Sequence, residues 1–162
     1  MSKPTPNNAT AKTASAHSGV GVRRSVVALL AAICLLAAVA LFVQDQKSDT
    51  LVVNGQRYAL MVADTNASRE KGLGDRAGLA QNAGMLFVFP AAGRQCFWMK
   101  DMHFSLDMIW TDQSKRVVRV VPELSPSTYP NAYCADNAQY VIELNAGQAA
   151  RAGVRVGEVL NF

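Results

Sequence analysis

The sequence is poor in the residues from which metal sites and nucleophilic active sites are built. Its 162 residues include two histidines and three cysteines. His103 is the only histidine after residue 50, and no second histidine stands at ligand spacing, so no metal site is predicted. Gly72-Leu73-Gly74 lacks the third glycine and the strand-to-helix context of a phosphate-binding loop. We therefore predict no cofactor and assign no catalytic residue.

Charge is also scarce, and it is unevenly placed. The formal net charge is +4. Residues 1–47 carry five basic residues and one acidic residue, which accounts for the whole excess, whereas residues 48–162 carry eleven of each sign. A segment without net positive charge has no general attraction for phosphate backbones, so we predict no nucleic-acid partner.

The N-terminal part divides into three predicted segments. Residues 1–25 are rich in small polar residues and end with Arg23 and Arg24, which is typical of a disordered, basic cytoplasmic leader. Residues 26–43 form an uncharged apolar run, and residues 44–50 form a polar linker. At about 1.5 Å per helical residue, the apolar run is just long enough to span a bilayer core of roughly 30 Å.

Two interpretations of residues 26–43 remain open. The run is either an uncleaved signal anchor or a signal peptide that is cut after Ala38-Val39-Ala40. In both cases the basic flank stays in the cytoplasm and residues 51–162 lie outside it. We therefore expect a protein of the cytoplasmic membrane with an extracytoplasmic domain, or a secreted protein if the leader is removed.

After residue 50 the pattern is that of short β-strands. Asn54-Gly55 between two apolar runs favours a type I′ hairpin turn, and Thr65 can cap a short helix that Gly72 ends. The expected strands are 51–53, 56–63, 84–89, 95–99, 102–111, 116–121, 138–144 and 154–160, with a stop at Pro90, a loop at 122–137 and a helical turn at 148–152. We predict a mainly β fold, either a small β-sandwich or a partly open barrel of about six to eight strands with one or two short helices.

Cys96 and Cys134 are the only cysteines outside the apolar run. A pair of cysteines in an extracytoplasmic domain favours a disulfide. A reactive thiol is the alternative, but no C-x-x-C spacing or neighbouring base supports it in the sequence.

Trp98, Lys100 and Asp107 lie beside a strongly apolar run and can line a ligand groove. The alternative places Trp98 in the core, with Lys100 paired to Asp107 or Glu143 at the rim of the sheet.

Four segments together have a familiar order and spacing. They are Gly84-Met85-Leu86-Phe87-Val88-Phe89, Cys96-Phe97-Trp98-Met99-Lys100-Asp101-Met102, Leu106-Asp107-Met108-Ile109 and Tyr140-Val141-Ile142-Glu143-Leu144-Asn145-Ala146-Gly147. The chain from about Leu51 to Leu160 resembles the domain of unknown function 192 (DUF192) family of small, often exported prokaryotic proteins. The resemblance implies a mainly β fold but no activity. The recurring polar positions of the family match Thr65, Arg76, Lys100, Asp107 and Glu143, whereas Gly74 stands where a larger apolar residue is usual.

We predict an anchored or exported binding or interaction module. Its ligand, a small polar or carboxylated molecule, would contact Arg76, Trp98, Lys100, Asp107 and Glu143. One alternative is an envelope enzyme that hydrolyses a glycan or peptide with Asp107 and Glu143 as acid and base. The other is a structural protein of envelope assembly, whose partner would be another envelope protein.

Overall fold

The first two strands form the hairpin that the Asn-Gly pair predicts. In the computed structural model, which describes residues 48–162, β1 (Ser48–Val53) pairs antiparallel with β2 (Gln56–Ala63). Asn54 and Gly55 have φ angles of 46° and 79°, in the left-handed region that a type I′ turn requires. Because β1 begins at Ser48, the sheet starts inside the segment that was predicted as a linker, 44–50.

The predicted leader and apolar run, residues 1–25 and 26–43, lie outside the described residues. Within residues 48–162, no helix has the length and apolar character needed to cross a membrane.

Pro90 does not end the strand that contains it, contrary to the prediction. β3 (Ala83–Phe97) joins the predicted strands 84–89 and 95–99 into one, parallel to β2 and antiparallel to β6 (Tyr133–Asn145). The register between β3 and β6 shifts between Val88 and Gly93. The missing amide hydrogen of Pro90 therefore falls in an irregular stretch, where a regular ladder does not need it.

β4 (Leu106–Thr111) lies between β6 and β5 (Val117–Leu124), and all of its residues are buried. Alternation from residue 102 onwards predicted a strand with one mostly polar face. The strand instead begins at Leu106. Both of its faces are covered, because Ile109 packs in one hydrophobic cluster while Met108 and Trp110 pack in another. β5 and β6 also extend into the predicted loop 122–137, with the short helix η1 (Pro126–Thr128) between them.

The strands form a single sheet in the order β1-β2-β3-β6-β4-β5. Within residues 48–162, the predicted mainly β fold is therefore confirmed, with six strands and two short α-helices, α2 (Asn66–Lys71) and α3 (Gln148–Arg151). A two-sheet sandwich is not formed by residues 48–162, since all their strands are hydrogen-bonded in one sheet.

The C-terminal residues bridge both outer strands of this sheet. The amide of Val52 in β1 donates to the carbonyl oxygen of Asn161 at 2.9 Å, and Arg116, just before β5, forms a bridge with Val159. The predicted closing strand 154–160 is thus reduced to isolated bridges. They cover backbone groups that an edge strand would otherwise expose.

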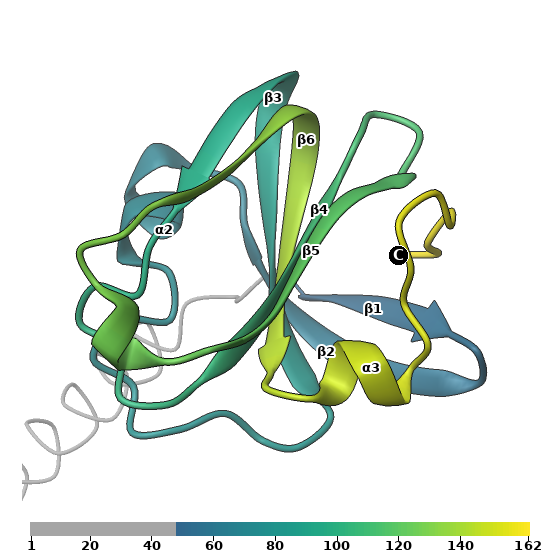
Figure 1. Ribbon diagram of the computed structural model, residues 1–162. Helices are drawn as coiled ribbons and strands as arrows, with labels where there is room; N and C mark the ends of the chain where they lie inside the picture. Colours follow the sequence, from purple (N-terminus) through teal and green to yellow (C-terminus); the bar gives the residue numbers. More distant parts are fainter. Residues whose placement is uncertain (1–47) are drawn as a thin grey trace, which may run out of the picture. The chain divides into compact units, whose positions relative to one another are not determined.

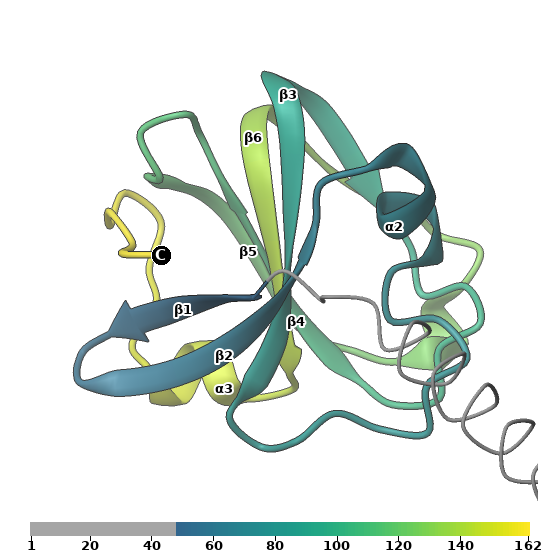
Figure 2. The ribbon, with the colours of Figure 1, turned by 180° about the vertical axis from the view of Figure 1, so that it is seen from behind.

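The hydrophobic core is divided between the two faces of the sheet. Ile109 and Ile142 belong to one cluster, with residues of β1, α3 and the C-terminal segment, while their neighbours Met108 and Val141 belong to the other. Figures 1 and 2 show α2 on one side of the β3–β6 pair and β1 with the C-terminus on the other. Successive residues of these central strands therefore face different surroundings.

Candidate functional site

Helix α2 begins with a capping box and is held against β3 by Arg69. Thr65 and Ser68 form a capping box, in which the Ser68 amide donates to Thr65 Oγ1 at 3.1 Å and the Thr65 amide donates to Ser68 Oγ at 3.0 Å. Nη1 of Arg69 donates to the Val88 carbonyl oxygen at 2.7 Å, and its guanidinium lies 5.3 Å from the centroid of the Phe89 ring. These contacts fix the position of α2, which forms one wall of a cavity.

The cavity has a volume of about 360 Å³ and lies between α2, β3 and the residues that follow each of them. Volumes of this order are typical of small-molecule sites. Phe87, Phe89 and Phe97 line it, and Phe97 meets the other two edge to face, at centroid distances of 4.7 Å and 6.3 Å. Trp98 also lines the cavity and is 53% exposed, so an indole is available to a bound molecule.

Glu143 contributes a carboxyl group to the cavity from the centre of the sheet. It lies in β6, in register with Met85 of β3 and Met108 of β4, and is only 5% exposed. Within residues 48–162 its side chain has no hydrogen-bond or ion-pair partner. Burial raises the pKa of Glu143 to about 8, because water no longer stabilises the charged form. At neutral pH the cavity therefore contains a neutral carboxylic acid between two methionines.

The mouth of the cavity carries more positive than negative charge. Arg69, Glu70 and Lys71 line it from α2, and Lys100 lines it from the loop after β3. Lys71 pairs with Asp75 at 2.6 Å on the surface. The Lys100 ammonium forms no hydrogen bond or ion pair within the described part of the chain, so the predicted pairs of Lys100 with Asp107 and Glu143 are not formed.

Asp107 is fully buried but lies away from the cavity. Its carboxylate accepts hydrogen bonds from the backbone amides of Glu123 at 2.8 Å, Gly147 at 3.0 Å and Ala149 at 2.7 Å. The carboxylate thus ties β4 to the end of β5 and to the first turn of α3. Asp107 therefore stabilises the fold, and it does not take part in a site with Glu143.

Arg76 is also separate from this cavity. It is exposed and does not line the cavity, although it follows the loop that does. Of the five predicted ligand contacts, the fold brings together Trp98, Lys100 and Glu143, and leaves out Arg76 and Asp107.

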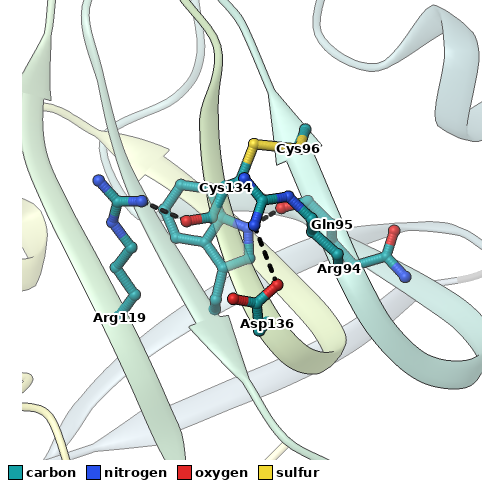
Figure 3. A network of polar contacts seen from close by, with 7 residues as sticks. Arg94, Gln95, Cys96, Arg119, Cys134 and Asp136 are labelled. Atoms are coloured by element: carbon teal, nitrogen blue, oxygen red, sulfur yellow. Dashed lines mark hydrogen bonds and ion pairs between the residues drawn. A yellow bond between two sulfur atoms is a disulfide. The ribbon is translucent and has the colours of Figure 1, made fainter.

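The predicted disulfide between Cys96 and Cys134 is present and joins the paired strands β3 and β6 (Figure 3). Arg119 donates to the carbonyl oxygen of Cys134, and Arg94 pairs with Asp136 at 3.2 Å. Cys96 lines the cavity immediately before Phe97 and Trp98. The disulfide therefore anchors the wall that carries these two aromatic residues.

Sequence reasoning missed the contributions of Arg69 and of the three phenylalanines. Arg69 was read only as part of a short capped helix, and the phenylalanines only as apolar strand residues. Gly72, directly after α2, lies 3.5 Å from Phe87, measured from the position that a Cβ atom would occupy. No local sequence pattern predicts the contact between Gly72 and Phe87, because the two residues lie in different elements.

Comparison with known proteins gives a family but no activity. The family model DUF192, described as "Uncharacterized ACR", matches residues 50–162. No curated protein matches the chain.

Two similar solved structures come from bacteria. One is a protein from Sinorhizobium meliloti 1021, described as a "putative transcription regulator", with 28% identity and a TM-score of 0.64; the match covers 69% of this chain and 89% of that one. The other is a protein of unknown function from Novosphingobium aromaticivorans DSM 12444, with 27% identity and a TM-score of 0.67; the match covers 74% of this chain and 89% of that one.

Proposed function

The chain belongs to the DUF192 family, and we propose that its domain is an extracytoplasmic module that binds a small organic ligand in the cavity above Glu143. One observation carries the proposal. A carboxyl group that is 5% exposed and lacks a partner in residues 48–162 opens into a cavity with aromatic walls. Burial of an unpaired polar group costs free energy, and a ligand that hydrogen-bonds to the group offsets that cost.

Binding fits this geometry better than two-carboxylate hydrolysis does. A glycosidase-type mechanism needs both carboxyl groups beside one scissile bond. Asp107 is occupied by three backbone amides and projects away from the cavity. Glu143 and Asp107 therefore do not form the acid–base pair that the hydrolase alternative requires.

Thermal-shift screening of the full chain against envelope metabolites tests the binding proposal. We expect at least one compound to raise the melting temperature of the wild type. The rise should be smaller for Trp98→Ala, which removes the exposed indole, and for Glu143→Gln. Arg76→Ala is the matched control, because Arg76 is exposed and outside the cavity. A compound that stabilises all four proteins equally would contradict binding at this site.

We further propose that residues 26–43 tether the domain to the cytoplasmic membrane and deliver it outside, or direct its secretion if they are removed. The disulfide supports this location, since such bonds persist in oxidising compartments. A reporter that is active only outside the cytoplasm, fused after Phe162, should be active. Activity of a cytoplasm-specific reporter at the same position would contradict the proposed location.

A further inference from the structure

The cavity also indicates the chemistry of its ligand. Resting on the proposed binding function, we infer that the ligand carries an ammonium group, which binds to the carboxylate of Glu143, on an apolar or aromatic body. The sequence predicted a small polar or carboxylated ligand, and this inference restricts that class to molecules with an ammonium group.

Charge at the inner end of the cavity is the first argument. Glu143 is flanked by Met85 of β3 and Met108 of β4, so neither neighbouring strand supplies a cation beside it. The charged residues that line the cavity are Arg69, Glu70, Lys71 and Lys100. None of these pairs with Glu143, so a cation that binds to its carboxylate would come from a bound molecule.

The cations of α2 are held by other groups. Arg69 donates to the carbonyl oxygens of Asp64 and Val88, and Lys71 pairs with Asp75. Lys100 forms no ion pair within residues 48–162 and stays at the exposed mouth. An ammonium at Glu143 would therefore meet its counter-ion inside the cavity, while Lys100 remains available for an anionic group at the outer end of a zwitterion.

The aromatic walls are the second argument. Aromatic faces attract cations electrostatically, and more strongly where water is excluded. Phe89 already interacts in this way with Arg69, at 5.3 Å from guanidinium carbon to ring centroid. Phe87, Phe97 and the exposed Trp98 offer further aromatic surface in the same cavity. The carboxylate of Glu143 and the aromatic walls of the cavity would therefore both attract an organic cation.

The affinity of an ammonium ligand should depend on pH in one direction. With a Glu143 pKa of about 8, most of the carboxyl groups are protonated at neutral pH, so an ammonium must displace one proton on binding. Its affinity should therefore rise up to about tenfold per pH unit below that pKa and level off above it. A neutral ligand that accepts a hydrogen bond from the protonated acid would show the opposite trend.

Three probes with the same ring distinguish these cases: benzylamine, benzyl alcohol and benzoate. Binding to the full chain can be followed by tryptophan fluorescence, because Trp98 lines the cavity and is exposed, whereas Trp110, the other tryptophan, is buried. We expect benzylamine to bind about tenfold or more tightly than benzyl alcohol above pH 8, where charge-assisted hydrogen bonds form. Its affinity should fall with decreasing pH, and Glu143→Gln should abolish both the preference and the pH dependence.

The outcomes of this experiment distinguish a failure of the ammonium inference from a failure of the proposed binding function. Equal or tighter binding of benzyl alcohol or benzoate would overturn the ammonium inference and leave the binding function standing. Binding of none of the three would overturn the ammonium inference, and the thermal-shift screen would then decide the binding function. If Glu143→Gln does not fold, the pH dependence of the wild type decides, because a benzylamine affinity that stays flat or falls as the pH rises from about 6 to about 8 overturns the inference.

Discussion

Asp107 and Glu143 lie on neighbouring strands and project from opposite faces of the sheet. Asp107 is in register with Leu144, and Glu143 with Met108, which belong to different core clusters. One carboxyl group accepts three backbone hydrogen bonds, while the other opens into a cavity. Two buried acids on paired strands therefore have different roles, one in stability and one in the candidate site.

Replacement of Asp107 by Asn should destabilise the domain. An amide keeps one acceptor oxygen and loses the negative charge, so the amides of Gly147 and Ala149 can no longer both be satisfied. Hydrogen bonds to charged groups contribute about 1.5–3 kcal/mol, so we expect a loss of at least about 2 kcal/mol in urea unfolding. Asp112→Asn is the control, because its carboxylate also accepts amides but in a partly exposed turn. Equal losses in both variants would contradict a special role for Asp107.

The stability of the wild type should fall as pH rises, through the contribution of Glu143. Its pKa is near 4.5 when solvated and about 8 in the folded protein. Between these values the unfolded state has released the proton and the folded state has kept it, so stability is full at the acid end and declines by about 1 kcal/mol per pH unit. Glu143→Gln removes this contribution. As pH rises, the variant should therefore gain stability relative to the wild type. A constant difference between the two from pH 5 to 8 would refute the raised pKa.

Removal of the disulfide should lower stability by about 4 kcal/mol on the chain-entropy model, since the bond joins residues 38 positions apart. Denaturant unfolding of the wild type with and without reductant measures the effect. A variant with both cysteines replaced by alanine should match the reduced wild type and be insensitive to reductant. A wild type whose unfolding midpoint does not respond to reductant would count against the bond.

Alanine should be tolerated poorly at Gly84 and well at Gly78. A Cβ atom at Gly84 would lie 2.7 Å from the Glu143 carbonyl oxygen and from methyl groups of Leu60 and Leu144. Overpacking of this kind costs typically about 1–3 kcal/mol, which thermal or urea unfolding can measure. Gly78 has no atom within 4 Å of that position, so Gly78→Ala should stay close to the wild type. Similar stabilities for the two variants would show that the sheet adjusts around Gly84.

Local chemistry explains the predictions that hold. The Asn54-Gly55 hairpin and the Thr65 cap depend on residues that are neighbours in the chain. The disulfide was predicted from cysteine count and location, and the structure pairs those same residues. The prediction of a strand end at Pro90 failed, because the irregular pairing of β3 with β6 tolerates a residue without an amide hydrogen.

The sequence alone determined the family, the β character, the hairpin, the capped helix and the cysteine pair, because each follows from neighbouring residues or from composition. Only the tertiary structure decided which polar residues meet. Glu143 joins Trp98 and Lys100 because β6 pairs with β3, while Asp107 is turned away by the alternation of side chains along β4. Strand pairing over long sequence separations sets these neighbours, and a one-residue change of register would exchange the two faces.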